Sequence, residues 1–372
     1  MERRSNKIIY ETHSWAGVLF SIVLFIISFS GIVSLFDKEL TQWERPSHRI
    51  VYDKSQSINI DRLVKPVLAA ANLRQDRPIL ITLPNKYHPT LAVSWVDVES
   101  DKVIKEHINP VSEKVIHRQG NDFTELLRRM HTDLLLPQPF GRYFIGFMGL
   151  LMMLSILSGI IIHKKIFSEM FKFRINRSKR LLWTDFHKVL GVWPLPFHIM
   201  ISFSGAMLGL AGLMINVAAL SAFDGDVDAA VATVLGERVE ISGQLLPDYS
   251  LDLFVKKYRI DRPKSTPTML MIEGYGDLNQ VVQVSGEKEG ALVSFSNIKY
   301  RSHNHEILHI NTADDATPFM LAYYALTPLH YALYGGFLIK ALYFVLGLSL
   351  CLMMVSGTVI WQIRQAQRSK SV

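Results

Sequence analysis

Cysteine is almost absent from this chain: of its 372 residues, only Cys351 is a cysteine. A lone cysteine excludes an intramolecular disulfide, a cysteine-rich zinc or iron–sulfur site, and covalent cofactor attachment through a C-x-x-C-H motif. The sequence also contains no G-x-G-x-x-G loop after a strand-like run, no P-loop and no serine-hydrolase elbow. NAD(P)H or flavin is therefore not expected to bind within this chain. Thirteen histidines remain as the abundant ligands for a transition metal.

Charge is missing from four long apolar runs, although 20% of all residues are charged. A helix needs about 20 consecutive apolar residues to cross the hydrocarbon core of a bilayer. The first run follows basic residues, as in a signal peptide, but it is longer than a typical apolar signal segment and no small-residue cleavage site follows it. We therefore predict four membrane-spanning helices, including a retained first one, over residues 15–36, 143–162, 189–213 and 341–361.

Basic residues gather at the N-terminus, in the connection between the second and third runs, and in the C-terminal tail. Four crossings put all three places on one side of the membrane, which the positive-inside rule identifies as cytoplasmic. The formal net charge of +7 then reflects topology and anionic lipid headgroups, and no nucleic-acid partner is expected. The predicted order is a cytoplasmic N-terminus and first span (1–37), a first periplasmic module (38–130), a histidine segment and second span (131–163), a basic cytoplasmic loop (164–186), the third span (187–213), a second periplasmic module (214–325), and a histidine segment, fourth span and basic tail (326–372).

The chain repeats itself in the same direction. His13 and Gly31 in the first span lie 18 residues apart, as do His187 and Gly205 in the third. The second and fourth spans share a similar spacing, of 28 and 27 residues, between a preceding histidine and the glycine of a Ser-Gly pair. A parallel duplication of this kind predicts two similar halves related by a pseudo-twofold axis along the membrane normal.

Each half also carries a polar segment with the same order of predicted elements. The fold class predicted from this pattern is an α-helical membrane protein, a four-helix transmembrane bundle from a tandem, parallel duplication with two periplasmic α+β modules. Helices are predicted over 61–72 and 251–258, and strands over 79–83, 91–98 and 103–108 in the first half and over 268–272, 280–284 and 291–298 in the second.

Histidines lie at corresponding ends of the predicted spans, with His13 and His187 near the cytoplasmic ends and His131 and His330 just before spans on the outer side. Imidazoles in membrane-spanning segments are costly and usually functional. Facing imidazoles on two helices are what a non-covalent, bis-histidine haem requires, so two levels of histidines predict two b-type haems, one toward each leaflet. Four glycines of the first and third spans are expected to let the macrocycles approach the backbone: Gly17, Gly31, Gly191 and Gly205.

His198 breaks the symmetry of the two halves. It follows His187 by 11 residues, close to three helical turns, so in an unbroken helix both imidazoles share one face about 16 Å apart. Pro194 and Pro196 lie between them and can distort that helix. His198 is therefore a candidate ligand of the outer haem, in place of one of the two outer histidines.

Other histidines leave two interpretations open. His163 corresponds to Trp361 in the other half, and it is either a cofactor contact or an interfacial residue. The sequence His303-Asn-His305-Glu306 can bind a metal ion or an iron-loaded substrate, but a solvated strand or loop is the favoured interpretation. For the duplicated histidines, the alternative to haem binding is helix capping or hydrogen bonding between helices, with the glycines at helix contacts.

The motifs are similar to those of a known family. The pattern H-x-x-x-G…S-x-S-G in the first and third spans, with M-H-T-D-L-L-L-P before the second and L-H before the fourth, resembles the PepSY-associated transmembrane family and, within it, the ferric-siderophore reductase type of the ferrioxamine reductases. The resemblance covers nearly the whole chain. It implies bacterial inner-membrane proteins whose b-type haems are held by span-end histidines, a role that falls here on His13, His131, His187 and His330.

These observations together lead to one hypothesis and two alternatives. The hypothesis is a di-haem oxidoreductase that passes electrons from quinol or a cytoplasmic reductase to a ferric hydroxamate siderophore in the periplasm, because reduction to Fe(II) labilises the metal. Nearby charges such as Arg142, Lys340 and Asp133 would tune the haems. The alternatives are a siderophore permease, in which the histidines relay protons, and a non-catalytic regulator whose PepSY-like modules bind a protease or peptide.

Overall fold

The computed structural model describes residues 2–51, 58–85, 88–116, 123–163, 166–170, 172–174, 177–236, 238–288 and 290–370. Two residues of the basic loop, Lys164 and Lys165, lie outside the described residues. The chain divides into two compact units. One comprises Met1–Asp37, Asp122–Gly225 and Leu326–Val372, and is helical; the other comprises Lys38–Asn121 and Asp226–Ala325, and contains the sheet.

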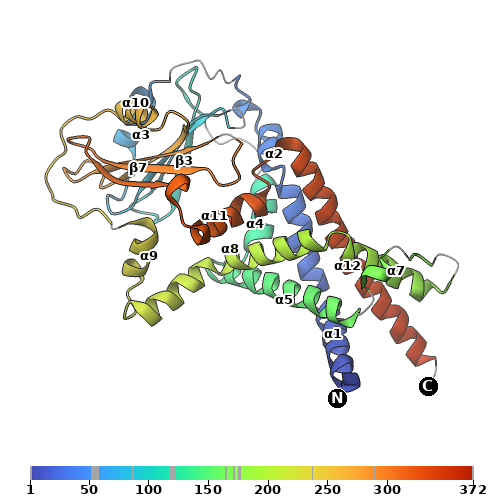
Figure 1. Ribbon diagram of the computed structural model, residues 1–372. Helices are drawn as coiled ribbons and strands as arrows, with labels where there is room; N and C mark the ends of the chain where they lie inside the picture. Colours follow the sequence, from blue (N-terminus) through green and yellow to red (C-terminus); the bar gives the residue numbers. More distant parts are fainter. Residues whose placement is uncertain are drawn as a thin grey trace. The chain divides into compact units, whose positions relative to one another are not determined.

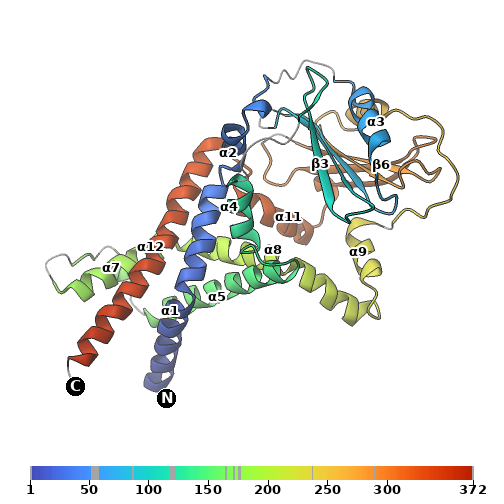
Figure 2. The same cartoon turned by 180° about the vertical axis from the view of Figure 1, so that it is seen from behind.

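Within the described ranges, four helices of the helical unit are long and apolar enough to cross a membrane, as the sequence predicts. They form two pairs, each with one helix from either half of the chain, because α1 packs along α12 and α5 packs along α8. In the ribbon views the α5–α8 pair lies across the α1–α12 pair (Figures 1 and 2). The four helices are α1 (Glu2–Ser34), α5 (Phe140–Ile162), α8 (Leu195–Ala222) and α12 (Gly336–Ser369).

The third predicted span is displaced toward the C-terminus. A helix that carries His187, α7 (Lys179–Val192), ends before Pro194, and α8 begins only at Leu195. Proline has no backbone N–H to donate and its ring clashes with the preceding turn, so Pro194 and Pro196 break the helix here. The apolar helix then continues to Ala222 rather than ending at residue 213.

Short helices complete the helical unit and carry the histidines that precede spans. His131 lies near the end of α4 (Phe123–Thr132), which packs against α1. His330 lies at the end of α11 (Pro318–Tyr331). The remaining short helix is α6 (Ile166–Glu169).

The two predicted modules form one continuous sheet. Its eight antiparallel strands run in the order β4-β3-β2-β1-β5-β6-β7-β8, so the two halves of the chain meet at the β1–β5 pair. In that seam Ile79 lies opposite Ile272 and Ile81 opposite Leu270. The strands are β1 (Ile79–Thr82), β2 (Leu91–Val96), β3 (Val103–Ile108), β4 (Val115–Ile116), β5 (Thr266–Glu273), β6 (Val281–Glu287), β7 (Phe295–Arg301) and β8 (Ile307–Thr312).

One face of this sheet is covered by two equivalent helices, α3 (Ile60–Ala70) and α10 (Leu251–Asp261) (Figure 1). Alternate residues of the strands, such as Val93 and Val284, are fully buried against Val64 of α3 and Phe254 of α10 in a single core. Burial of one strand face with exposure of the other is the usual pattern of an antiparallel sheet. Shorter elements of this unit are α2 (Asp37–Glu44), η1 (Pro46–His48), α9 (Val227–Leu235) and η2 (Ala313–Asp315).

Candidate functional site

Two cavities lie within the helical unit, and each is lined by one histidine pair of the duplication. The small cavity, of about 130 Å³, is lined by His131 and His330. The large cavity, of about 470 Å³, is lined by His13 and His187. Each half of the chain therefore contributes one histidine to each cavity, as the duplication predicts.

The imidazoles of the small cavity face each other across it. The ring centroids of His131 and His330 are 5.9 Å apart and their planes are inclined by 25°. Two imidazole nitrogens on opposite sides of one metal ion, each about 2 Å from it, would place the ring centroids about 6 Å apart. The spacing of this pair thus fits a single metal ion held between the rings.

Two of the four glycines that were expected to give a macrocycle room lie beneath the imidazoles of the small cavity. A Cβ at Gly31 would lie 2.7 Å from Cε1 of His131, and a Cβ at Gly205 would lie 3.1 Å from Cε1 of His330. Only a residue without a side chain leaves this room for the ring. Both glycines are preceded by a serine, and Oγ of Ser204 lies 2.9 Å from Nδ1 of His330.

The large cavity repeats this arrangement with different Ser-Gly pairs. Nδ1 of His13 lies 2.8 Å from Oγ of Ser158, and its Cε1 would lie 3.4 Å from a Cβ at Gly159. Nδ1 of His187 lies 2.9 Å from Oγ of Ser356 and 2.9 Å from the carbonyl of Met353. The next residue, Gly357, would bring a Cβ within 3.3 Å of Cε1 of His187.

The hydrogen bonds assign the same tautomer to all four histidines. Nδ1 of His131 meets the carbonyl of Ile27 at 2.8 Å, so it is the donor. The three serine hydroxyls already donate to backbone carbonyls of their own helices, so each accepts the Nδ1–H of its histidine. Nε2 then keeps its lone pair in each ring, the tautomer and orientation that a metal-ligating histidine needs.

Two of the predicted glycines do not seat a ring. Gly17 has nothing within 4 Å of a Cβ position, and Gly191 has only the sulfur of Met353, at 3.4 Å. Both line the large cavity, so the expectation that they leave space for a macrocycle remains a prediction. Gly159 and Gly357, which lie against the rings of His13 and His187, were not predicted as site residues. Both belong to the Ser-Gly pairs of spans two and four, and this repeat was the signal that could have identified them.

Other glycines, which the sequence analysis missed, bring the spanning helices together. A Cβ at Gly209 would lie 2.7 Å from the backbone nitrogen of Gly146, and a Cβ at Gly149 would lie 2.9 Å from that of Ala206. Small residues allow such close backbone approach in membrane helices. The sequence did not predict this contact, because the spacing Gly146-x-x-Gly149 does not distinguish these two glycines from the other small residues of the span.

The structure places His198 in the large cavity and not in the small one. The helix break at Pro194 puts it on a different helix from His187, so the shared helical face predicted for these two residues does not exist. His198 is fully buried, its Nε2 lies 3.2 Å from Oγ of Ser349, and its Nδ1 has no partner among the described residues. His163, at the end of α5, lines the same cavity.

A single layer of side chains separates the two cavities. Leu24, Met152 and Leu350 line both of them. Ligands in the two cavities would therefore be near neighbours within the apolar interior of the unit.

The H-x-H-E residues lie elsewhere, in the turn between β7 and β8. The His305 ring packs 5.1 Å from that of Phe254, whereas His303 is exposed. Glu306 lies 3.7 Å from the Arg301 guanidinium. Within the described ranges, no three or more histidine, cysteine or acidic side chains converge as metal ligands.

Comparison with known proteins finds a family and a relative of similar sequence. A sequence model of the PepSY-associated TM region matches residues 10–364. A relative from Pseudomonas aeruginosa, "Uncharacterized protein PA4219", is 25% identical over 252 residues, which is 65% of this chain. The chain spans 64% of the length of that relative.

Proposed function

The chain belongs to the PepSY-associated TM region family of multi-pass membrane proteins, and we propose that it is a di-haem reductase that delivers electrons to a ferric hydroxamate siderophore. The observation that carries this proposal is the pair of cavities lined by the four duplicated histidines, His13, His131, His187 and His330, whose Nδ1 atoms are each held by a hydrogen bond that leaves Nε2 to bind a metal. Histidines that merely bridged helices would not need a glycine beneath each ring or a cavity in front of it.

The donor set fits b-type haem. In the proposed assignment His131 and His330 hold one haem, while His13 and His187 hold the other. Haem when bound supplies reversible one-electron chemistry of iron. The large cavity falls within the usual volume range of cofactor sites, whereas the small one is below it, so its occupation requires the apolar lining to widen.

The residues around each cavity prepare it for electron transfer. Serine and backbone acceptors fix the histidines before any ligand binds, so little reorganisation accompanies a change of charge. The small cavity is lined mainly by apolar side chains, together with the two histidines, Arg142 and five hydroxyl side chains: Ser28, Ser34, Thr132, Tyr331 and Tyr343. The shared layer of Leu24, Met152 and Leu350 keeps the proposed sites in adjacent positions along the route between the two sides of the membrane.

The direction of transfer follows from the charge pattern. The basic termini and the basic loop favour the cytoplasmic side, which puts the large cavity toward the cytoplasm and the small one toward the periplasm of a bacterial inner membrane. Electrons enter from quinol or a cytoplasmic reductase. The siderophore is the substrate on the periplasmic side, and its Fe(III) leaves as Fe(II), which hydroxamates hold far less tightly.

An absorption spectrum of the purified full-length protein, oxidised and then reduced with dithionite, tests the proposal. We expect a bis-histidine Soret band, a sharp α-band on reduction, and two non-covalent haems per chain. His131→Ala with His330→Ala should remove one haem, and His13→Ala with His187→Ala the other, whereas exposed His303→Ala should remove none. Protein without haem contradicts the proposal and favours the permease or regulator.

Reduction of the substrate is tested separately. Proteoliposomes that contain a quinol inside should form Fe(II), trapped by an external chelator, from an external ferric hydroxamate complex. Haem-loaded protein that never reduces such a complex contradicts the siderophore assignment while leaving the haem assignment intact.

A further inference from the structure

Arginine is the recurrent charged residue at both cavities. Among the described residues, Arg142 is the only charged side chain, apart from the histidines, that lines the small cavity. Arg180, Lys188 and Arg364 line the large cavity. No aspartate or glutamate lines either cavity within the described part of the chain.

Lys188 is already neutralised by the protein. Its Nζ lies 3.1 Å from Asp185 and 3.8 Å from Glu169. Asp185, which is fully buried, also accepts hydrogen bonds from Arg174, including one at 2.6 Å. These four side chains form a closed network of two cations and two anions, so Lys188 has little capacity left for a ligand.

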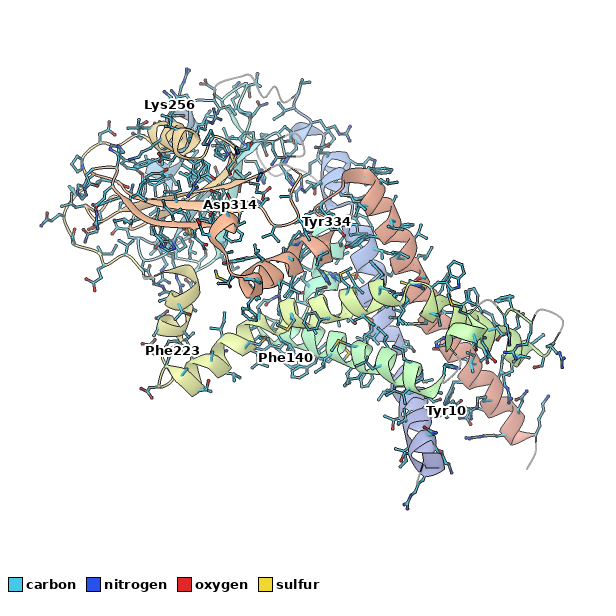
Figure 3. The ribbon with its side chains drawn as sticks, viewed as in Figure 1. Tyr10, Phe140, Phe223, Lys256, Asp314 and Tyr334 are labelled. Carbon is cyan, nitrogen blue, oxygen red and sulfur yellow. The ribbon has the colours of Figure 1, made fainter. Side chains whose placement is uncertain are left out.

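The three arginines differ from Lys188 in this respect. No described carboxylate lies within ion-pair distance of Arg142, Arg180 or Arg364. Arg180 donates one hydrogen bond, of 2.9 Å, to Oε1 of Gln367. Arg364 lies over the ring of Tyr10 at 4.7 Å, on the part of α1 near the N-terminus (Figure 3). A guanidinium has five N–H donors, so both keep most of their donors free.

The duplication does not repeat the arginines themselves at the corresponding positions of the other half. The spacing of His13 from His187 makes Asn6 the counterpart of Arg180, and the spacing of the two Ser-Gly pairs makes Ile166 the counterpart of Arg364. Lys340, the counterpart of Arg142, does not line the small cavity. Each cavity has thus acquired arginine from one half only.

We propose that Arg142 in the small cavity, and Arg180 with Arg364 in the large cavity, bind the carboxylates of the two cofactors. The inference rests on the proposed haem assignment and names the groups that anchor each haem. An unpaired guanidinium beside an apolar cavity loses hydration that an anion restores, and its planar fork matches a carboxylate with two parallel hydrogen bonds. A b-type haem brings two propionate carboxylates.

Redox titration of the purified holoprotein separates the two cavities. In Arg142→Gln, loss of a positive charge should lower the midpoint potential of one haem and leave the other unchanged. Arg180→Gln with Arg364→Gln should lower only the other potential. Haem transfer to excess apomyoglobin should become about tenfold faster or more from the altered cavity alone, the order expected for loss of a charge-assisted hydrogen bond.

Matched variants keep the test decisive. Arg368→Gln, one turn further along α12, removes the same charge from a residue that lines neither cavity, and it should change neither potential. Arg364→Lys keeps the positive charge, so the midpoint potential should stay at the wild-type value. It lacks the planar guanidinium that makes two parallel hydrogen bonds, so haem should still be lost faster than from the wild type. If Arg142→Gln fails to fold, Arg142→Lys supplies the same comparison for the small cavity.

The outcomes distinguish this inference from the function on which it rests. Wild-type protein without haem contradicts the proposed function and the anchors with it. Wild-type protein with two haems, together with glutamine variants whose potentials and haem-loss rates equal those of Arg368→Gln, overturns the anchors alone.

Discussion

Asp61 and Asp252 cap each other's helices. The carboxylate of Asp252 accepts the backbone N–H groups of Ile60 and Asp61 at the start of α3, both at 3.0 Å. The carboxylate of Asp61 accepts those of Leu251 and Asp252 at the start of α10, at 2.9 and 3.3 Å. The first turns of two helices that lie 190 residues apart in the chain therefore depend on one reciprocal contact between the halves.

Removing either carboxylate should loosen both helices. Asp61→Ala or Asp252→Ala should cost about 1–2 kcal/mol, the usual loss on removal of an N-terminal cap. Hydrogen-exchange mass spectrometry of the full-length protein should show faster exchange in α3 and α10 together. Asp248→Ala breaks only an exposed pair with Lys65 and should change exchange little. Faster exchange confined to one helix would contradict the reciprocal cap.

The same contact makes this unit sensitive to acid. Burial raises the pKa of the Asp61 carboxyl, but hydrogen bonds from Ser250, Leu251 and Asp252 outweigh burial and hold that pKa below its usual value. A carboxyl with a lower pKa in the folded state stabilises it above the unfolded-state value of about 4 and loses this effect as the pH falls further. Protection of the amides at the start of α10, corrected for the intrinsic pH dependence of exchange, should therefore fall below about pH 4 in the wild type and less steeply in Asp61→Ala.

Gly31 and Gly17 provide a matched pair of substitutions on one helix. A Cβ at Gly31 would lie 2.7 Å from the His131 ring, whereas Gly17 has open space at that position. Gly31→Ala should displace His131, lower the thermal midpoint through overpacking worth about 1–3 kcal/mol, and remove one haem from the purified protein. Gly17→Ala should leave the midpoint and the seated histidines unchanged. Equal behaviour of both variants would contradict the seat assigned to Gly31.

His107, on β3, should make the sheet unit less stable at mildly acidic pH. Burial, with the nearby charges of Lys105, His48 and Arg45, lowers the pKa of His107 to about 3. The unfolded chain binds this proton near pH 6.5 and the folded chain does not, so stability is complete above pH 6.5 and falls as the pH drops toward 3. Between pH 7.5 and 5 we expect a loss of up to about 2 kcal/mol, which His107→Gln should reduce. A variant with the wild-type pH dependence of its thermal midpoint would contradict this assignment.

A disulfide can test the seam between the halves. Leu80 of β1 lies opposite Met271 of β5, and opposed residues of antiparallel strands have Cα atoms about 4.5–5.5 Å apart, within disulfide range. Leu80→Cys with Met271→Cys, in a Cys351→Ala background, should form a disulfide on oxidation. After cleavage at a protease site inserted between α5 and α7, the two fragments should migrate together until reduced. Leu80→Cys with Gln283→Cys spans two strand spacings and should not cross-link.

Much of this architecture was predictable because the sequence contains two copies of each signal. Charge-free runs predict the spanning helices, and repeated spacings of histidine and glycine predict which residues meet. Gly31 and Gly205 were expected to give a macrocycle room, and the structure places the rings of His131 and His330 against them instead. Six of the eight strands overlap predicted ones, whereas β4, with two residues, and β8, interrupted by polar side chains, carry too weak an alternating pattern.

Other features depend on contacts that spacing does not encode. The helix break before α8 follows from proline, yet whether a proline kinks or ends a membrane helix depends on its neighbours. His198 was therefore predicted on the wrong helical face. The joining of both modules into one sheet arises from pairing of two edge strands, β1 and β5, and neither strand differs in sequence from one that faces solvent.

The seam and the cavities have a consequence for the origin of the chain. One half alone would expose the edge of β1 or β5, which invites pairing with another copy, and would hold only one histidine of each pair. A single copy would need a second copy to pair that edge and to complete each histidine pair, and fusion makes this assembly an intramolecular event with a high effective concentration. Fusion also ends the symmetry constraint. In a homodimer every substitution appears in both copies. The fused chain instead has Arg180, His198 and Arg364 in its second half, without the same residues at the corresponding positions of its first half.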